Sequence, residues 1–347
     1  PVFMLFTSGS TGPAKGVTHS RESMSYMFAS SAAGFEMTSR DRLLPGSSLS
    51  HIGGILFSFS VLSLGGQAIV ARSYGPDEIL PLLREEEPTV LCMLPCALFN
   101  LLREGHATHD DFKSLRLMRS GSDKVPIELE NEFMELTGIP IDEGYGCSEM
   151  GLATLNPPSA RIIPGSAGRP VPGFDISIRD ENGNEVPSGQ PGVVWMRTKS
   201  RMLGYWNDPE ATAKVFDGAW FDSGDIMQAD EYGYMYFRGR KKQIIIHNSL
   251  NIFPQEVEDV LLLHPDVAYA GVIGVHDLVH GENVRAYVVA KDGTSPSESG
   301  LIAFAQEQIG YKAPEDIRFL EEMPLNPTGK VDRVTLKKMA EEAHDHS

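Results

Sequence analysis

A loop near the start of the chain carries residue types that bind anions. It reads "TSGSTGPAKG" from Thr7 to Gly16 and directly follows the apolar run "VFMLF". Successive backbone N–H groups in a loop of glycine and hydroxyl residues form a concave anion site, and a helix that begins after the loop adds positive potential. Lys15 supplies a positive charge. The pattern therefore predicts a site for an anion such as a phosphate group.

Two other interpretations of this loop were weighed against the spacing. A flexible linker has a similar composition, but linkers rarely follow a strand directly and carry a lysine. A Walker loop needs Gly-Lys-Ser/Thr in direct succession, and here Pro13 and Ala14 separate Gly12 from Lys15. The Walker loop is therefore excluded, and the anion site is favoured over the linker.

The charge and cysteine content limit the partners of the chain. Its 347 residues include 30 Lys and Arg against 47 Asp and Glu, a net charge of −17, which disfavours binding to nucleic acid or an anionic membrane. Three cysteines make no disulfide framework and indicate a cytoplasmic protein. No apolar run approaches the ~20 residues of a membrane span. No signal peptide is evident, although a chain that starts at Pro1 could have lost a targeting segment.

Hydrophobic patterns predict the elements that must position the loop. Apolar residues 65–71 and 88–95 predict short buried strands, and residues 76–87 and 126–138 predict amphipathic helices. Strands that alternate with helices are typical of parallel α/β layers. We therefore expect a layered α/β region over residues 1–164.

Two further regions differ in composition. Residues 165–240 are rich in Gly and Pro, with short strands and an Asn-Gly hairpin signal, and predict a small β-rich subdomain. Residues 241–347 predict a compact α+β C-terminal domain. It would contain a helix from Pro254, strands at 267–275 and 284–290, and a helix whose capping box starts at Ser295 and includes Glu298. The predicted fold class is α/β.

The opening loop resembles the phosphate loop of adenylate-forming enzymes, which include acyl- and aryl-CoA ligases, luciferases and adenylation domains of peptide synthetases. Four more motifs follow in the order typical of that family. They read "EGYGCSEMG" at 143–151, "WFDSGDI" at 220–226, "YFRGRKKQIII" at 236–246 and "PLNPTGKVDR" at 324–333. Five ordered motifs over nearly the whole chain make coincidence an unsatisfactory explanation.

The resemblance implies a set of residues that bind ATP and then AMP: Thr7, Ser8, Gly9, Ser10, Thr11, Gly12, Lys15, Ser122, Gly144, Tyr145, Gly146, Asp225 and Arg240. It implies that Tyr145 stacks on adenine and that Asp225 accepts hydrogen bonds from both ribose hydroxyls. Ser148 would contact the α-phosphate and Glu149 would hold Mg²⁺, whose preferred ligands are oxygens. Taken singly, Tyr145 is equally typical of a core aromatic, Glu149 of a solvated charge and Asp225 of a turn residue.

The last motif places a lysine far from the opening loop. The resemblance implies that Lys330 reaches the active site during adenylation, and that the C-terminal domain turns about Lys242 as a hinge between the two steps. Ser148, Glu149 and Lys330 are then the expected catalytic residues. Without the other motifs, "PTGK" would be read as a polar turn before a terminal helix.

The acid pocket and the thiol channel are the parts where the sequence departs from the family. The resemblance implies that His51, Gly121 and Gly151 line the acid pocket, and the alternative for His51 is a residue that only begins a helix. Asp123 and Lys124 replace small apolar residues and are either solvated turn charges or contacts to a polar group of the substrate. No aspartate lies between Leu43 and Ser63, which argues against an α-amino acid.

The segment after the hinge, "HNSLNI", differs from the glycine-rich family loop at the CoA channel. Asn248 and Ser249 would line that channel, and asparagine tolerates the left-handed conformation that glycine usually adopts there. Family members also carry a substantial segment before the phosphate loop, whereas two residues precede "FMLF" here. We therefore expect an incomplete N-terminal region, covered in a homodimer or by a partner, unless the chain is a fragment.

These observations predict an acid–CoA ligase. A small carboxylic acid and ATP would give an acyl-adenylate and pyrophosphate, and CoA would then displace AMP, with ATP, Mg²⁺ and CoA required. Two alternatives stay open: transfer to a carrier-protein thiol or no thiol step, and a catalytically idle scaffold. The sequence does not identify the acid.

Overall fold

The computed structural model describes residues 1–7, 14–121, 125–248, 250–277, 279–326 and 330–344. The chain divides into two compact units, each with its own core. Unit 1 contains residues 1–223 and 227–237, and unit 2 contains residues 224–226 and 238–347. The division expected near residue 241 stays a prediction, as does the boundary at residue 165.

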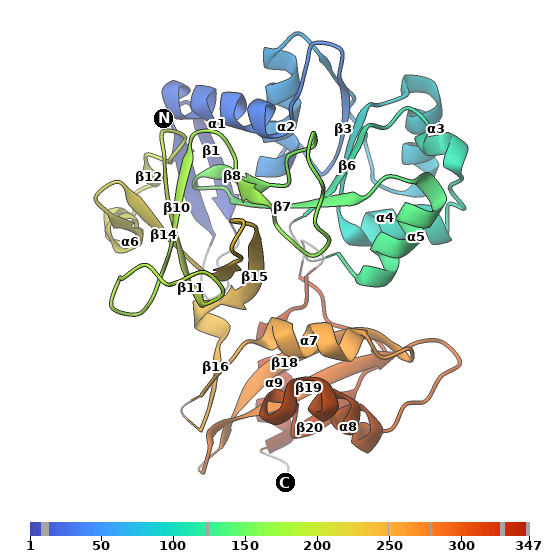
Figure 1. Cartoon of the computed structure of the whole chain (residues 1–347), viewed down its shortest axis with the longest axis vertical. Helices are drawn as coiled ribbons and strands as arrows, with labels where there is room; N and C mark the ends of the chain where they lie inside the picture. The colour runs from blue at the N-terminus through green and yellow to red at the C-terminus, as the bar shows by residue number, and fades with distance from the viewer. Residues whose placement is uncertain (8–13, 122–124, 249, 278, 327–329, 345–347) are drawn as a thin grey trace. The chain divides into compact units, whose positions relative to one another are not determined.

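Unit 1 is built around a seven-stranded sheet (Figure 1). Its strands, in spatial order, are β4 (Gln67–Ala68), β3 (Arg42–Gly46), β5 (Val90–Met93), β6 (Leu117–Ser120), β7 (Ile141–Cys147), β8 (Gly151–Leu155) and β9 (Arg169–Pro170). The pairs from β4 to β7 are parallel, and β8 and β9 are added antiparallel. All four residues of β5 and of β6 are buried, as expected for parallel strands covered on both faces.

Helices cover the two faces of this sheet separately. The helices are α1 (Arg21–Gly34), α2 (Ile52–Ser63), α3 (Pro76–Glu86), α4 (Pro95–Arg103) and α5 (Ile127–Thr137), with a 3₁₀ turn η1 (His109–Phe112). Figure 1 shows α1 and α2 apart from α3, α4 and α5. Side chains of α1 and α2 share a core with Leu43, Val90 and Leu117, whereas α3, α4 and α5 pack with Leu91 and Met118. Adjacent strand residues therefore point to opposite layers.

Local sequence signals explain where these helices begin and end. Pro76 occupies the first turn of α3 together with two acidic residues, and Arg84 lies in its last turn, so charges complement the helix dipole at both ends. Helix α5 ends at Gly138, whose φ of +72° is the left-handed conformation that glycine adopts without a steric penalty.

Two smaller sheets complete unit 1. One has the order β1 (Phe3–Thr7), β2 (Lys15–His19), β12 (Gly204–Tyr205). The other contains β10 (Phe174–Arg179), β11 (Pro191–Thr198), β13 (Phe216–Asp217), β14 (Trp220–Ala229) and β15 (Met235–Arg240), and a short helix α6 (Pro209–Val215) precedes β13. The Asn-Gly signal marks a tight turn between Asp180 and Asn184, next to an antiparallel bridge of Arg179 with Glu185. Strands β10 and β11 pair antiparallel across the longer connection 180–190.

Unit 2 is a sheet with helices on both faces. Its elements are η2 (Lys241–Gln243), β16 (Ile245–His247), β17 (Leu250–Ile252), α7 (Pro254–Leu262), β18 (Val267–Asp277), β19 (Gly281–Ala290), α8 (Glu298–Ile309), η3 (Gly310–Lys312), β20 (Asp316–Phe319) and α9 (Arg333–His344). Helices α7 and α8 pack on the face that includes Val272, and α9 packs on the opposite face with Ile273.

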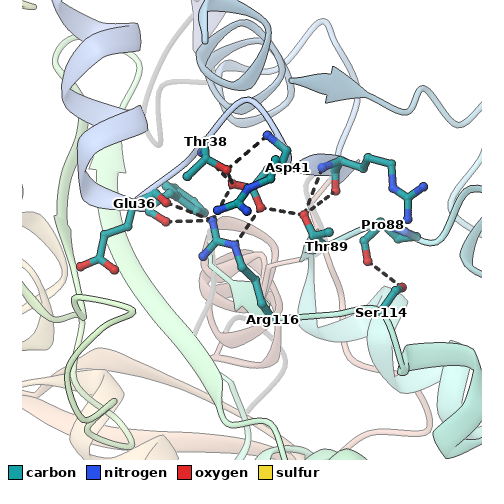
Figure 2. A network of polar contacts seen from close by, with 10 residues as sticks. Glu36, Thr38, Asp41, Pro88, Thr89, Ser114 and Arg116 are labelled. Carbon is teal, nitrogen blue, oxygen red and sulfur yellow. Dashed lines mark hydrogen bonds and ion pairs between the residues drawn. The ribbon is translucent and has the colours of Figure 1, made fainter. Parts of the chain in front are cut away.

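A polar network joins the amino ends of three central strands in unit 1 (Figure 2). Asp41, Thr89 and Arg116 are the residues immediately before β3, β5 and β6. The Arg116 guanidinium donates to both carboxylate oxygens of Asp41, at 2.8 and 3.0 Å, and the Thr89 hydroxyl donates to Asp41 at 2.8 Å. The network thus holds the amino ends of these strands together. The site residues lie at the opposite edge of the sheet, where the strands have their carboxyl ends.

The predicted mixed α/β fold class is confirmed, with two local corrections. Only Gln67 and Ala68 of residues 65–71 form a strand. The cap of α8 is Ser297, whose hydroxyl accepts from the Gly300 N–H, and not Ser295. The sequence prediction was wrong because Glu298 is the first helical residue and its carboxylate accepts from the Ile317 N–H instead of closing a capping box. Among the described residues, no helix is long and apolar enough to cross a membrane.

Candidate active site

The turn between β7 and β8 holds two of the expected catalytic residues in a defined position. Ser148 and Glu149 lie in this turn at the carboxyl edge of the central sheet. The Glu149 carboxylate accepts a hydrogen bond of 2.9 Å from the Tyr205 hydroxyl, and its backbone carbonyl accepts one of 2.7 Å from the Met202 N–H. The carboxylate is therefore oriented by a neighbouring strand.

Tyr205 also connects Glu149 to the end of the opening loop. Strand β12 pairs with β2, which places Tyr205 opposite Val17. The Lys15 ammonium lies over the Tyr205 ring, 4.7 Å from its centroid, a cation–π contact. Burial, together with the Glu149 charge, raises the pKa of Tyr205, so its hydroxyl stays a donor at neutral pH. Lys15, Tyr205 and Glu149 thus form one connected group.

A buried histidine holds the backbone of Ser148 by a hydrogen bond. His19 is fully buried at the end of β2, and its Nε2 donates to the Ser148 carbonyl at 2.8 Å. A carbonyl can only accept, so Nε2 carries the proton, which leaves Nδ1 to accept from the Ser23 hydroxyl at 3.3 Å. Burial lowers the pKa of His19 and favours this neutral form. His19 is a positioning residue that fixes the backbone at Ser148.

The turn is compatible with the expected Mg²⁺. Among the described residues, no group of three or more His, Cys, Asp or Glu side chains could hold a metal ion. Mg²⁺ in nucleotide sites is usually held by one or two carboxylates together with substrate phosphates and water. Glu149, with Tyr205 fixing its direction, fits that requirement as a single protein ligand.

The glycines around Tyr145 permit close packing of the β7–β8 hairpin. A Cβ at Gly146 would lie 2.4 Å from the Gly151 carbonyl oxygen, and Gly151 has a φ of +92°. A Cβ at Gly144 would lie 2.9 Å from the Thr154 carbonyl oxygen. Tyr145 is half-buried and packs against the core shared with α1 and α2. Its proposed role in stacking on adenine stays a prediction.

Of the remaining nucleotide residues, Thr7 lies in unit 1, Asp225 and Arg240 lie in unit 2, and the others fall outside the described residues. Asp225 on β14 is buried and forms an ion pair with Arg240 at the end of β15, with 3.2 Å between Oδ1 and Nε. The structure thus brings together Asp225, predicted to contact the ribose, and Arg240, predicted to lie near the ribose or a phosphate. Thr7 ends β1. The predictions for Ser8, Gly9, Ser10, Thr11, Gly12 and Ser122 fall outside the described residues.

Three other predicted residues also belong to unit 2. The Lys330 N–H donates to the Asn326 side-chain oxygen at 3.1 Å, and its carbonyl accepts from the Asn326 N–H at 2.8 Å. Lys242 lies in η2. Asn248 has a φ of +50°, the left-handed conformation that the sequence anticipated, while Ser249 falls outside the described residues. The hinge and channel roles of Lys242 and Asn248 stay predictions.

Two residues expected in the acid pocket lie at the carboxyl edge of unit 1. His51 is the N-cap of α2, and its Nδ1 accepts from the Gly53 N–H at 3.2 Å. His51 therefore begins a helix, as the alternative interpretation expected. Its role in the acid pocket stays a prediction. Gly121 follows β6 directly. Asp123 and Lys124 fall outside the described residues.

Sequence reasoning missed Tyr205, His19 and Arg119. Tyr205 follows Gly204 in "LGYWND", an aromatic residue in a glycine turn, which was an available signal. His19 was an available signal as well, because it ends the same "KGVTH" strand that starts at Lys15. Nothing in the sequence separates Arg119 from an exposed arginine.

Comparisons with known proteins identify the family of the chain. A family model described as AMP-binding enzyme matches residues 1–206, and one described as AMP-binding enzyme C-terminal domain matches residues 256–330. A long-chain-fatty-acid--CoA ligase from Yersinia pestis is 34% identical over 343 residues, covering 96% of this chain and 61% of that protein.

Two further similarities are informative. The fatty acid--[acyl-carrier-protein] ligase ScoC from Streptomyces coeruleorubidus is 33% identical over 347 residues, covering 97% of this chain and 67% of that protein. The crystal structure of ATP-bound MatB from Rhodopseudomonas palustris matches with a TM-score of 0.91 and 30% identity, over 97% of this chain and 67% of that chain. The chain thus spans about two thirds of the length of these proteins.

Proposed function

The chain belongs to the AMP-binding enzyme family, and we propose that it is an ATP-dependent ligase that joins a carboxylic acid to CoA through an acyl-adenylate. The observation that carries this proposal is the connected group of Lys15, Tyr205 and Glu149 at the carboxyl edge of the central sheet. A lysine for phosphate and an oriented carboxylate lie within reach of one tyrosine. Ligands of α/β sheets typically bind at that edge.

The proposed reaction has two balanced steps. An oxygen of the acid attacks the α-phosphorus of ATP; the new P–O bond forms as the bond to pyrophosphate breaks. The CoA sulfur then attacks the acyl carbon; the C–S bond forms, the C–O bond to AMP breaks, and the thiol proton is released. Both steps need orientation and charge neutralisation rather than a protein nucleophile.

The described residues divide these tasks. Lys15 neutralises phosphate charge beside the opening loop, and Ser148, held by His19, contacts the α-phosphate. Glu149 holds Mg²⁺, which supplies charge neutralisation to the phosphates when bound. The Asp225–Arg240 pair serves the ribose, and Lys330 serves the adenylation step. The three cysteines form no disulfide, in keeping with a cytoplasmic enzyme.

Transfer to a carrier-protein thiol is the second candidate, favoured by the similarity to ScoC. The first step is the same, and only the acceptor differs. CoA consumption compared with carrier-protein loading, both with the same acid, distinguishes the two acceptors. Accumulation of acyl-AMP with neither acceptor consumed would contradict a thiol ligase.

Pyrophosphate exchange into ATP with short, long and aromatic acids tests the proposal. We expect acid-dependent exchange by the 347-residue chain, which Lys330→Ala lowers by about 100-fold or more while ATP binding is retained. Lys337→Ala is the matched control, because Lys337 is an exposed lysine on α9 in the same unit. Absence of exchange with every acid, in a folded chain that binds ATP, would support the idle scaffold instead.

A further inference from the structure

An arginine lies in the interior of unit 1, in the row of side chains just below the carboxyl edge of the central sheet. Arg119 on β6 is 9% exposed and stands in register with Cys92 on β5 and Asp142 on β7. The row lies on the sheet face covered by α1 and α2, where Phe57 of α2 packs over the guanidinium, 4.9 Å from carbon to ring centroid. Apolar side chains fill the previous row, Leu43, Val90 and Leu117.

The Arg119 guanidinium makes few hydrogen bonds to the protein for a buried charged group. One terminal nitrogen donates to the Gly144 carbonyl at 3.3 Å, and Nε has no hydrogen-bond partner. In the part of the chain that the structure describes, no carboxylate oxygen forms an ion pair with it within 4 Å. Two carboxylates, Asp142 and Glu143, act on Arg119 electrostatically. One Asp142 oxygen accepts from the Asn156 amide at 2.9 Å, and one Glu143 oxygen accepts from the Val125 N–H at 3.2 Å.

Such an arrangement is costly unless something else pairs with the charge. Arginine keeps its proton in proteins, so burial cannot be relieved by neutralisation, although burial does lower the pKa of Arg119. Asp142 offers incomplete compensation, because burial raises its own pKa to about 7. Buried charges are normally paired and fully hydrogen-bonded. The missing anion is therefore expected to come from a ligand.

Two glycines allow the terminal nitrogens of Arg119 to lie against the backbone at Gly121 and Gly144. A Cβ at Gly121 would lie 2.7 and 2.8 Å from these nitrogens, and a Cβ at Gly144 would lie 3.1 Å from one of them. Gly121 was expected in the acid pocket and Gly144 in the nucleotide site. A side chain at either position would collide with the guanidinium and displace it.

The distance along β7 separates Arg119 from the reacting centre. Four residue steps separate Gly144, which Arg119 contacts, from Ser148, which lies just beyond the end of β7 and where the α-phosphate is proposed to lie. At about 3.3 Å per residue these span on the order of 13 Å. The carboxylate that attacks the α-phosphorus therefore cannot be the group that Arg119 binds.

We propose that Arg119 binds a second acidic group of the acid substrate, so that the enzyme prefers dicarboxylic acids with a spacer of several carbon atoms. This inference rests on the proposed ligase function. Phe57 would cover one face of the guanidinium while the distal carboxylate takes the in-plane hydrogen bonds that the protein leaves unmade. Arg119 then determines specificity without taking part in bond formation.

The test compares matched acids on matched variants. Straight-chain dicarboxylic acids are paired with monocarboxylic acids of the same length, and pyrophosphate exchange gives kcat/KM for the wild type, Arg119→Met and Arg119→Lys. We expect the wild type to prefer dicarboxylic acids. Arg119→Met should lower kcat/KM for dicarboxylic acids about 10- to 100-fold, whereas kcat/KM for monocarboxylic acids should stay the same or rise. Arg119→Lys should retain part of the diacid preference, because it keeps the charge.

Controls separate a specificity role from a structural one. Arg179→Met removes another arginine that packs on aromatic rings in unit 1, those of Trp195 and Trp220, and should change neither preference. A wild type that uses monoacids at least as well as diacids overturns the inference and leaves the ligase function intact. The inference is also overturned if Arg119→Met lowers kcat/KM equally for dicarboxylic and monocarboxylic acids, or if it weakens ATP binding measured without acid.

A binding measurement decides the inference even without turnover. If no acid supports exchange, the proposed ligase function is refuted. Calorimetric titration of the wild type and Arg119→Met with the same diacids, with ATP present, then still measures whether Arg119 binds the diacid. Diacid binding that is lost in Arg119→Met supports recognition of a second acidic group. Equal binding by both variants, or binding by neither, overturns it.

Discussion

The network at the amino edge of the central sheet makes a quantitative prediction for Asp41→Asn (Figure 2). Burial alone would raise the pKa of Asp41, but hydrogen bonds from Arg116, Thr89 and the Thr38 N–H outweigh it and hold the pKa at about 2 rather than 3.8. That difference corresponds to about 2.5 kcal/mol of unfolding free energy at neutral pH. The Arg116 side chain is 35% exposed, so solvent screening reduces the expected loss to about 1–2 kcal/mol.

The sign of the pH dependence follows from the lowered pKa. Stabilisation by the ionised carboxylate is complete above pH 3.8, where the unfolded chain is also ionised, and it is lost as the pH falls toward 2. About half of it is gone at pH 3. The difference in stability between the wild type and Asp41→Asn should therefore be constant from pH 7 to about pH 5 and then shrink.

Tryptophan fluorescence measures this difference in unit 1 alone. All three tryptophans, Trp195, Trp206 and Trp220, belong to unit 1, so urea titrations followed by their emission report its unfolding. The control is Asp175→Asn, which removes the partner of Arg197 in a pair that is 60% and 50% exposed. That pair should contribute less than about 0.5 kcal/mol. Equal losses in both variants, or a difference that does not shrink below pH 4, would refute the reasoning.

Two further substitutions examine the site and unit 2. Tyr205→Phe removes the hydroxyl that orients Glu149 but keeps the ring under Lys15; we expect exchange activity to need about 10-fold more Mg²⁺, whereas Tyr236→Phe should leave Mg²⁺ dependence unchanged. Arg333→Met removes the guanidinium nitrogen that contacts both carboxylate oxygens of the buried Glu258, and it should cost unit 2 about 3 kcal/mol, measured as loss of amide-exchange protection; the loss should be smaller at pH 6 than at pH 8, because burial raises the Glu258 pKa to about 7. Unchanged Mg²⁺ dependence or unchanged protection would contradict these two interpretations.

Much of the fold could be predicted from local patterns. The helices at 76–87 and 126–138 and the strand within 88–95 were expected from periodicity and burial, because each pattern lies within one element. The N-cap residue of α8 was harder to predict from the sequence. Ser295 and Ser297 both suit an N-cap, and the choice was made by Glu298, which hydrogen-bonds the distant Ile317 N–H.

The sequence by itself determined the family, the α/β class and the ordered motifs, because those depend on residue types at short fixed spacings. Only the tertiary structure decided which side chains act together. Tyr205 meets Glu149 across 56 residues, and His19 meets Ser148 across 129. Arg119 looks like any arginine in the sequence; its proposed role comes from strands β5 and β7, which bury it without an ion pair within 4 Å among the described residues. Burial and pairing are properties of neighbours in space, and no local pattern encodes them.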